Sequence, residues 1–311
     1  MSNAMRTLGF ELMRFRPINV VLRAVVGRVR SRLPWGLVHN IPMVGEIELD
    51  LPDGRQVVLV SDGYDSLASR VYWSGIDGFE PESLRLFLEL LETSEAVLDI
   101  GSHVGLYALL AAVDRPDTQV YAFEPVPRNL EYLRANVARN DASNVVVEAA
   151  AVGASDGEIV LQIPDTHRLP ATATTRDRTP GGAADRTVPT KVDLVSVDGY
   201  LTGREHGSID LIKLDVEGAE ADTLRGAVET IERYKPAILC EILHGYADSE
   251  AIDAMFQGKG YRFFLVTDDG LIEHEALVGD PSYFYKNYLI IQADDVERRL
   301  ATPVTSLEDR T

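Results

Sequence analysis

From Ala96 onward, apolar residues gather in short runs typical of buried strands, and these runs alternate with segments in which apolar residues recur at helical spacing. The pattern predicts helices over 105–113 and 127–139, and strands over 96–100, 119–124 and 144–150. Such a chain builds a parallel, doubly wound sheet, because each helix carries it back to the start of the next parallel strand. We therefore expect an α/β fold.

The alternation resumes in the second half of the chain. Between the two halves, residues 163–191 are rich in Thr, Pro, Gly and Ala and show no apolar period, so we expect a long loop there. Loops longer than ~12–15 residues are usually either disordered or functional lids. The second half predicts helices and strands that bring the sheet to about seven strands: helices 219–234 and 250–256, and strands 209–215, 237–242, 261–266 and 287–292.

Residues 46–94 are expected to form a small cap that precedes the sheet. Apolar and polar residues alternate over 47–60 around an Asp53-Gly54 pair, which is typical of a β-hairpin. Residues 81–92 then place Pro81 in a first helical turn and gather their apolar side chains on one face, which predicts a helix. A hairpin and a helix therefore lie before the first strand of the sheet.

The residues before the cap form a basic arm. Met1 to Ala4 (MSNA) read as the remnant of an expression tag. The whole chain carries a net charge of −19, but Met5 to Arg32 holds seven arginines against Glu11 alone, so this segment is +6 and the remainder is near −25. Apolar residues interleave with the arginines, so the arm could lie on an anionic membrane surface, or pack on its own acidic domain or on a partner subunit. Pro17 interrupts any single helix here.

Four parts follow from these patterns: the tag remnant and basic arm (1–45), the cap (46–94), the main domain (95–295) and a C-terminal tail (296–311). The acidic body disfavours nucleic acid as a partner, because phosphate neutralisation supplies most non-specific affinity. Cys240 is the single cysteine, so no internal disulfide can form. No apolar stretch reaches the ~18 residues that span a bilayer. We expect a cytoplasmic protein, peripheral to a membrane at most, and the oligomeric state stays open.

The sequence VLDIGSHVGLY (97–107) joins a predicted strand to a helix through a loop with two glycines. Gly101 and Gly105 lack a Cβ, so the backbone can take a positive φ and a ligand can lie against it. The following helix offers unpaired N–H groups. The spacing G-x-x-x-G is neither the dinucleotide fingerprint G-x-G-x-x-G nor a P-loop. With Asp99 closing the strand, the loop predicts a cradle for a nucleotide-like ligand.

A second strand-end acid supports this prediction. Glu124 closes the strand of QVYAFEP (119–125) and lies 25 residues after Asp99, a span that holds one strand, one helix and a second strand. An acid at this position accepts hydrogen bonds from ribose hydroxyls in other doubly wound sheets. The ligand should therefore carry a ribose. The predicted cofactor site comprises Asp99, Gly101, Ser102, His103, Gly105, Glu124, Pro125 and Ala151.

The segment IKLDVEGAE (212–220) carries a third group of candidates. Lys213 lies in an otherwise apolar strand that ends at Asp215. Glu217 and Glu220 follow at the start of a helix, where the helix dipole favours acids, so a structural role explains them. Asp215 differs, because open α/β sheets bind ligands at the carboxyl ends of their strands. We expect Asp215 to belong to the functional site.

The next strand, AILCEI (237–242), contributes Glu241 and leads to His244. The carboxyl edge of the sheet brings Asp215, Glu241 and His244 within reach of one another, so a base or a metal cluster could form there. A histidine in a loop is also often just solvated, and both interpretations of His244 stay open. His103, inside the glycine loop, is expected to position cofactor or substrate rather than to act as the base.

Together these segments resemble the FkbM-type methyltransferases, a family of class I enzymes that use S-adenosylmethionine. The resemblance runs from about Tyr72 to Ile291 and is carried most specifically by IKLDVEGAE, together with VLDIGSHVGLY, YAFEPVPRN, LVSVDGYL, PAILCEI and KNYLII. One departure is His103, where the family usually shows Asn. Residues 5–45 lie outside the resemblance.

The resemblance implies a Rossmann-like fold with a seven-stranded, mostly parallel sheet whose last strand is antiparallel. It also implies transfer of a methyl group from S-adenosylmethionine to a hydroxyl of a sugar, a glycan or a polyketide-type molecule. Such hydroxyls are weak acids, so we expect either a general base or a divalent cation such as Mg²⁺ to assist. The catalytic candidates are Asp215, Glu241, His244 and Lys213. We assign no metal site outright, and Asp215 and Glu241 would be the ligands if a cation takes part.

Two alternatives from other classes are retained. A nicotinamide-dependent oxidoreductase also binds a ribose-containing cofactor, although the absence of G-x-G-x-x-G speaks against it. The other alternative is a non-catalytic cofactor-binding or membrane-docking module whose basic arm is its working part.

Overall fold

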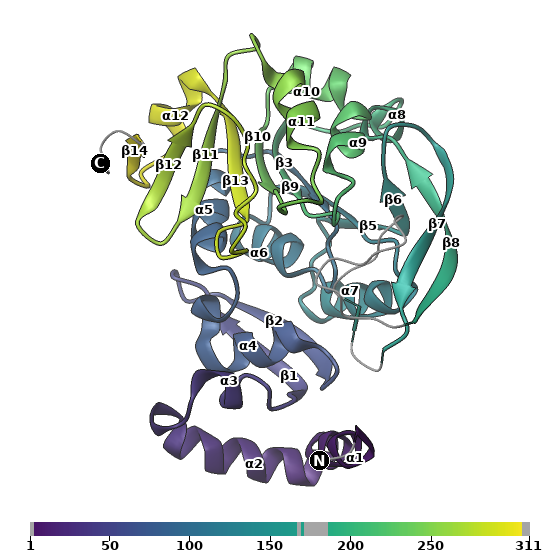
Figure 1. Ribbon diagram of the computed structural model, residues 1–311, viewed down its shortest axis with the longest axis vertical. Helices are drawn as coiled ribbons and strands as arrows, with labels where there is room; N and C mark the ends of the chain where they lie inside the picture. Colours follow the sequence, from purple (N-terminus) through teal and green to yellow (C-terminus); the bar gives the residue numbers. More distant parts are fainter. Residues whose placement is uncertain (1–2, 167–168, 171–185, 307–311) are drawn as a thin grey trace.

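The arm, the cap and the large sheet follow one another along the long axis of the molecule (Figure 1). The computed structural model describes residues 3–166, 169–170 and 186–306. Much of the predicted loop at 163–191 therefore lies outside the described residues. The arm occupies one end of the axis, the sheet and its helices fill the other end, and the cap lies between them.

The large sheet has nine strands in the spatial order β14-β12-β11-β13-β10-β9-β3-β4-β5. Strands β5, β4, β3, β9 and β10 run parallel, and β13 runs antiparallel to both of its neighbours, as predicted. The predicted count of about seven strands is too low because β12 and β14 extend one edge. The bounds are β3 (Ala96–Ile100), β4 (Gln119–Phe123), β5 (Val145–Glu148), β9 (Ile209–Leu214), β10 (Ala237–Glu241), β11 (Tyr261–Thr267), β12 (Gly270–His274), β13 (Asn287–Gln292) and β14 (Val304–Ser306).

Helices cover both faces of this sheet, which explains why its central strands are almost continuously apolar. Within β3, Val97 belongs to the core on the α5 and α6 face, while Leu98 belongs to the core on the α9, α10 and α11 face. Every residue of β3 is buried. The helices that accompany this sheet are α5 (Pro81–Leu91), which was predicted as part of the cap but packs against α6, β10 and β11, and then α6 (Leu106–Asp114), α7 (Pro127–Arg139), α8 (Val197–Leu201), α9 (Glu220–Arg225), α10 (Val228–Tyr234), α11 (Ser249–Phe256) and α12 (Ala293–Arg299).

The cap contains the predicted hairpin, whose strands pair antiparallel around the Asp53-Gly54 turn. Two asparagines at the end of α7 bind its edge: Asn136 is buried within the helix, and the half-buried Asn140 directly follows its last residue. Asn136 Oδ1 accepts the Val60 N–H at 2.7 Å, and Asn140 Oδ1 accepts the Val58 N–H at 2.8 Å. These contacts join the cap to the main domain. The cap elements are β1 (Val44–Asp50), β2 (Gln56–Asp62), α4 (Ser66–Ser74) and the 3-10 helix η2 (Gly75–Gly78).

The predicted helix over 219–234 is wrong as a single helix, because α9 and α10 are separated at Gly226. A Cβ on Gly226 would lie 2.0 Å from the carbonyl oxygen of Gly153. The break lets the backbone at Gly226 lie directly against the backbone of Gly153, the residue that follows β6. The helix propensities of residues 219–234 give no indication of this contact.

The predicted strand at 144–150 is also divided. Its first part is β5 of the large sheet, and its second part enters a separate sheet of β6 (Ala150–Val152), β8 (Thr187–Val195) and β7 (Gly157–Pro164). Residues 187–191 of the predicted loop therefore lie in a strand. Most residues of β7 and β8 are exposed or half-buried, so this antiparallel pair has no apolar period to read.

The arm forms two helices rather than one, with the predicted interruption near Pro17. Helix α1 (Asn3–Arg14) ends before Phe15, and α2 (Arg16–Val29) carries Pro17 in its first turn. The 3-10 helix η1 (Arg30–Arg32) and the short helix α3 (Trp35–Val38) complete the arm. At the other end of the chain, the predicted tail continues α12 and adds β14 to the edge of the large sheet.

Candidate active site

A cavity of about 470 Å³ opens at the carboxyl ends of β3, β4, β9 and β10, where the doubly wound fold binds its ligands. Eight predicted site residues line it: Gly101, Ser102, His103, Glu124, Pro125, Ala151, Asp215 and Glu241. Four others do not line it: Asp99, Gly105, Lys213 and His244. The cap contributes Ser66, Leu67, Phe79 and Glu80 to the lining of this cavity.

The glycine loop lies directly against the end of β9. Gly101 has a φ of 86°, and a Cβ there would lie 1.8 Å from the carbonyl oxygen of Asp215. The neighbouring main chain therefore excludes a side chain at position 101. Close approach of a ligand, the reason inferred from the sequence, is only part of the explanation. Gly101 and Ser102 donate their N–H groups to the Phe123 carbonyl, at 3.0 Å each. The loop is therefore fixed to both neighbouring strand ends.

Asp99 supports this loop from below instead of facing the cavity. Its side chain is 1% exposed, and Oδ2 accepts the N–H of Ala108 in the first turns of α6 at 3.0 Å. Burial raises the pKa of Asp99 to about 6, against the lowering effect of the Lys213 ammonium on the next strand. Asp99 is a positioning residue for the start of α6.

Glu124 lies on the cavity wall and holds two loop segments together. Its Oε2 accepts the His103 N–H at 2.8 Å, and its Oε1 accepts the Val126 N–H at 2.8 Å. Burial raises the pKa of Glu124 to about 7, and these N–H donors act in the opposite direction. Oε1 also accepts a long hydrogen bond from Asn129 Nδ2 at 3.5 Å, whereas Oε2 keeps a second lone pair that can accept a hydrogen bond from a ligand in the cavity.

His103 adopts a left-handed backbone with a φ of 52°. Asn tolerates this conformation better than most residues do, and His is also enriched there, which accounts for either residue at this position. Its Nε2 is buried and has no partner within the described residues. Burial lowers the pKa of His103, against the charges of Asp65 and Asp215. A neutral imidazole therefore lies at the cavity wall.

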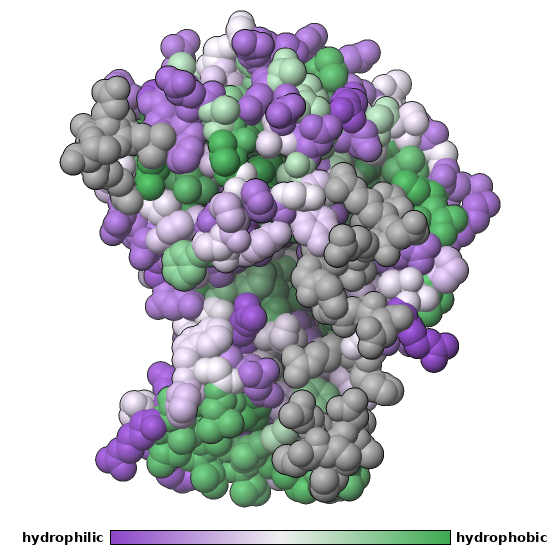
Figure 2. All heavy atoms as spheres, viewed as in Figure 1, coloured by the Kyte–Doolittle hydropathy of each residue, from purple (hydrophilic) through white to green (hydrophobic). Residues whose placement is uncertain are grey.

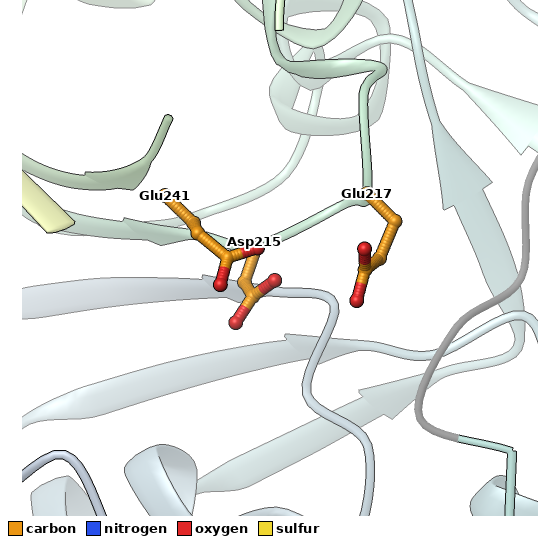
Figure 3. A group of neighbouring side chains, drawn as sticks. All are labelled: Asp215, Glu217 and Glu241. Atoms are coloured by element: carbon orange, nitrogen blue, oxygen red, sulfur yellow. The ribbon is translucent and has the colours of Figure 1, made fainter. Parts of the chain in front are cut away.

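Three carboxylates meet beside the glycine loop. Asp215, Glu217 and Glu241 each present an oxygen within 4.8 Å of the others, and Figure 3 shows that they come from the ends of two neighbouring strands. The Oε2 atoms of Glu217 and Glu241 are buried without a hydrogen-bond partner in the described part of the chain. We call Asp215, Glu217 and Glu241 the carboxylate cluster.

Burial, together with the crowding of like charges, governs the protonation of the carboxylate cluster. Burial, with the negative charge of Asp215 added, raises the pKa of Glu241 to about 8 and that of Glu217 to about 9. The pKa of Asp215 is lowered, because the ammonium groups of Lys213 and Lys286 outweigh its burial. Asp215 therefore carries the negative charge, and Glu241 can take up or release a proton near neutral pH.

Two lysines flank the cluster. Lys286 Nζ lies 2.6 Å from Glu241 Oε1, and Lys213 Nζ lies 3.4 Å from Asp215 Oδ2. Burial alone would lower the pKa of Lys213, but Asp215 and the other surrounding acids raise it to about 12. Both lysines thus remain cationic. Lys213 lies beneath the cavity wall and positions Asp215.

Glu80, Glu217 and Lys286 were not among the predicted site residues. Glu80 takes a left-handed backbone (φ 41°) before α5, accepts the Tyr107 hydroxyl at 3.2 Å and lies 3.7 Å from Lys286 Nζ. A charged residue directly before an apolar strand was a readable signal for Lys286, just as a charged residue directly after one was the signal for Asp215. Glu217 was assigned to the helix start, but its φ of 54° places it before α9 and on the cavity wall.

His244 does not join the carboxylate cluster. Its Nδ1 lies 3.1 Å from the Gly279 carbonyl, and its own carbonyl accepts the Tyr283 hydroxyl at 2.7 Å. The turn after β10 carries the chain away from the cavity toward the segment before β13. The predicted trio is therefore corrected to Asp215, Glu217 and Glu241.

The carboxylate cluster has the oxygen donors that a divalent cation prefers. Two protein cations already contact it, however, and Lys286 occupies one oxygen of Glu241. With Asp215 ionised and Glu217 and Glu241 largely protonated near neutral pH, the two ammonium groups already compensate the negative charge of the cluster without a metal ion. The residues therefore fit a proton-transfer site better than a closed cation site.

Comparison with known proteins assigns the family. Residues 99–263, more than half of the chain, match the family model of the methyltransferase FkbM domain. The chain belongs to the FkbM methyltransferase family. Its sheet, with β13 antiparallel between β10 and β11, is the Rossmann-like class I methyltransferase fold that the resemblance implied. Use of S-adenosylmethionine is general for this fold.

Several relatives of this FkbM-family chain are named for their reactions. Methyltransferase sdnD of Sordaria araneosa is 28% identical over 55% of this chain and 75% of its own length. Hexuronic acid methyltransferase AglP of Haloferax volcanii is 26% identical over 58% and 69%, respectively. The 31-O-demethyl-FK506 methyltransferase FkbM of Streptomyces tacrolimicus is 25% identical over 68% and 88%.

Among solved structures, methyltransferase FkbM from Methylobacillus flagellatus KT is 18% identical to this FkbM-family chain, with a TM-score of 0.41. The match covers 63% of this chain and 43% of that one.

Among the helices described here, none combines the length and the apolar character needed to cross a bilayer.

Proposed function

We propose that this protein is an S-adenosylmethionine-dependent O-methyltransferase that acts on a hydroxyl of a sugar, a glycan or a polyketide-type small molecule. The observation that carries the proposal is the carboxylate cluster at the ends of β9 and β10, directly beside the glycine loop that follows β3. Class I folds bind their ligands at this edge of the sheet. Proton acceptors and the donor cradle therefore share one cavity.

The residues fit the methyl donor. Gly101, Ser102 and His103 form one wall with little side-chain bulk, and the Glu124 carboxylate on the neighbouring strand keeps a lone pair for a ribose hydroxyl. Pro125 and Ala151 also line this side. When bound, S-adenosylmethionine would supply a methyl group already activated on a sulfonium. The ionised Asp215 carboxylate, which lines the same cavity, would favour that positive charge.

We infer that Glu241 is the general base. Its Oε2 is buried without a partner and the pKa of the group is raised to about 8, so the ionised carboxylate is a stronger base than an ordinary glutamate. It would take the hydroxyl proton as the new O–C bond forms and the C–S bond breaks. Asp215 would accept a hydrogen bond from the acceptor, and Lys286 would orient Glu241. Alignment of the acceptor with the methyl group would lower the activation barrier by about 7–11 kcal/mol, which is more than a general base contributes.

The names of the relatives support an oxygen acceptor on a small molecule. One relative is named for hexuronic acid and another for a demethylated FK506. The cap residues Ser66, Leu67 and Phe79 line the same cavity as the glycine loop, so the acceptor would lie between cap and sheet. The cavity surface around the acceptor is then partly apolar and partly acidic, which suits a neutral, polyhydroxylated molecule.

Calorimetry with S-adenosylmethionine, followed by product detection, tests the proposal. We expect saturable binding of the donor and none of NAD, and we expect S-adenosylhomocysteine to accumulate with at least one sugar or macrolactone acceptor. Glu241→Gln should retain donor binding and lose ~10²–10⁴-fold in turnover. Glu297→Gln, on the surface helix α12, is the matched control. Absence of donor binding by the wild type would overturn the proposal. Donor binding without turnover on any hydroxyl would favour the non-catalytic module.

A further inference from the structure

The arm exposes an unusual concentration of apolar side chains. Ten of the 18 large hydrophobic residues that are exposed in the described part of the chain lie between Leu8 and Leu37. In Figure 2 the hydrophobic colour gathers at the end of the molecule where Figure 1 draws α1 to α3. We define the arm face as the exposed apolar residues of α2, α3 and their junctions: Phe15, Ile18, Val20, Val21, Val25, Val29, Trp35 and Leu37.

The opposite side of the arm is held firmly against the cap. Asn19 is 1% exposed, and its Nδ2 donates to the carbonyls of Pro42 at 2.6 Å and Met13 at 2.9 Å. Val26 and Val38 are buried in the core that includes the cap. The arm is therefore a built part of the fold, and its orientation fixes which residues form the arm face. With no partner bound, the arm has one side that is buried against the cap and another side, the arm face, that is exposed.

Cations surround the arm face. Arg16, Arg28 and Arg32 are exposed and make no ion pair with the described residues. Between Leu8 and Leu37 there are six arginines and one acid, whereas the whole chain has a net charge of −19. An apolar helix face bordered by arginines, with a Trp at one end, has the features of an interfacial membrane helix.

We propose that the arm face binds the surface of an anionic lipid bilayer. The charge distribution favours this occupant over a second copy of the chain. A two-fold contact through the arm face would bring the same unpaired arginines of two subunits together, which is repulsive. Anionic headgroups instead neutralise them while the acyl boundary takes up the valines and Trp35. Repulsion between the bilayer and the acidic body would hold the sheet end away from the membrane.

Vesicle co-sedimentation with the full chain tests this proposal. The probes are vesicles of phosphatidylcholine alone and of phosphatidylcholine with about 30 mol% phosphatidylglycerol. We expect binding to the anionic vesicles, weak binding to the neutral ones, and a decrease as salt is added because screening shortens the attraction. Replacement of Arg16, Arg28 and Arg32 by Ser should weaken binding about 100-fold.

The apolar contribution needs its own variant and control. Val21→Glu with Val25→Glu places two charges on exposed positions of the arm face, and should abolish binding to anionic vesicles. Val160→Glu with Val188→Glu makes the same change on the exposed strands β7 and β8, and should bind like the wild type. Thermal unfolding of both variants shows that the fold is kept.

Three results would overturn the proposal. One is equal binding of neutral and anionic vesicles by the wild type. Another is unchanged binding by the Val21 and Val25 double variant. The third is a dimer in solution that this double variant dissociates, combined with no vesicle binding, because the occupant is then a second copy. None of these measurements depends on methyl transfer, so the proposed enzymatic function stands or falls separately.

Discussion

Lys286 donates a hydrogen bond of 2.6 Å from Nζ to Oε1 of Glu241. The two residues come from neighbouring antiparallel strands, since Lys286 immediately precedes β13 and Glu241 closes β10. The ammonium group lowers the pKa of Glu241, whereas burial and the charge of Asp215 raise it to about 8. The pair therefore sets the pH at which the proposed base becomes ionised.

The first prediction concerns the pH dependence of turnover. A base must be deprotonated to act, so kcat/KM should rise with pH and level off above an apparent pKa of about 8. In Lys286→Met the cation is lost, the pKa of Glu241 increases, and the rise should move to higher pH. Lys259→Met removes a surface cation that pairs with Glu232, and should leave the profile in place. A rise at the same pH in wild type and Lys286→Met would remove this pair from the mechanism.

The second prediction concerns donor affinity. Glu124 accepts N–H groups from His103 and Val126 with separate oxygens, and a glutamine amide can satisfy one of them at most. Glu124→Gln should therefore weaken S-adenosylmethionine binding by ~1.5–3 kcal/mol, about 10- to 150-fold in Kd. Glu131→Gln on the exposed side of α7 makes the same charge change and serves as the control in calorimetry. Equal affinities in the two variants would contradict the assignment of Glu124.

The third prediction separates backbone strain from close approach at two glycines. Gly54 and Gly101 have nearly the same φ, 88° and 86°, but a Cβ meets nothing within 4 Å at Gly54 and the Asp215 oxygen at Gly101. Gly54→Ala should cost about 1–2 kcal/mol of unfolding free energy, the value for a left-handed residue. Gly101→Ala should cost at least about 1–3 kcal/mol more, because the strand ends must separate. Denaturant unfolding of both variants measures the difference, and similar losses would argue against the close approach.

The fourth prediction concerns metal ions. Lys213 and Lys286 already contact the carboxylate cluster, so turnover should persist after treatment with a strong chelator and dialysis. Addition of Mg²⁺ should change the rate little. Loss of activity with chelator that Mg²⁺ restores would show that a cation displaces Lys286, and the cluster would then be a metal site.

Apolar periodicity predicted the large sheet well, because its strands are buried on both faces and its helices have one clear apolar face. The strand at 96–100 and the helix at 127–139 match β3 and α7 residue for residue. The same method missed β8, β12 and β14. Most residues of β8 are exposed, β14 has three residues at the edge of the sheet, and β12 has only two buried apolar residues, Leu271 and Ile272, so no apolar pattern marks these strands.

Residues of the candidate site were predictable where they lie at the carboxyl ends of parallel strands. Asp215, Glu124 and Glu241 could be assigned from their place in the chain, since parallel strands present their carboxyl ends to one edge. Glu80 could not, because it reaches the cavity from the cap through a contact between distant segments. His244 was misplaced for the same reason, since the path of a turn after a strand is set by tertiary contacts.

The contact between Gly101 and the Asp215 carbonyl joins the proposed donor cradle to the carboxylate cluster. These two parts of the proposed site are held directly against each other, whereas the cap lines the cavity from a separate segment of the chain. Changes in the cap can therefore alter which acceptor is admitted without altering the spacing between methyl group and base. In this fold the choice of substrate can diversify while the chemistry stays constant.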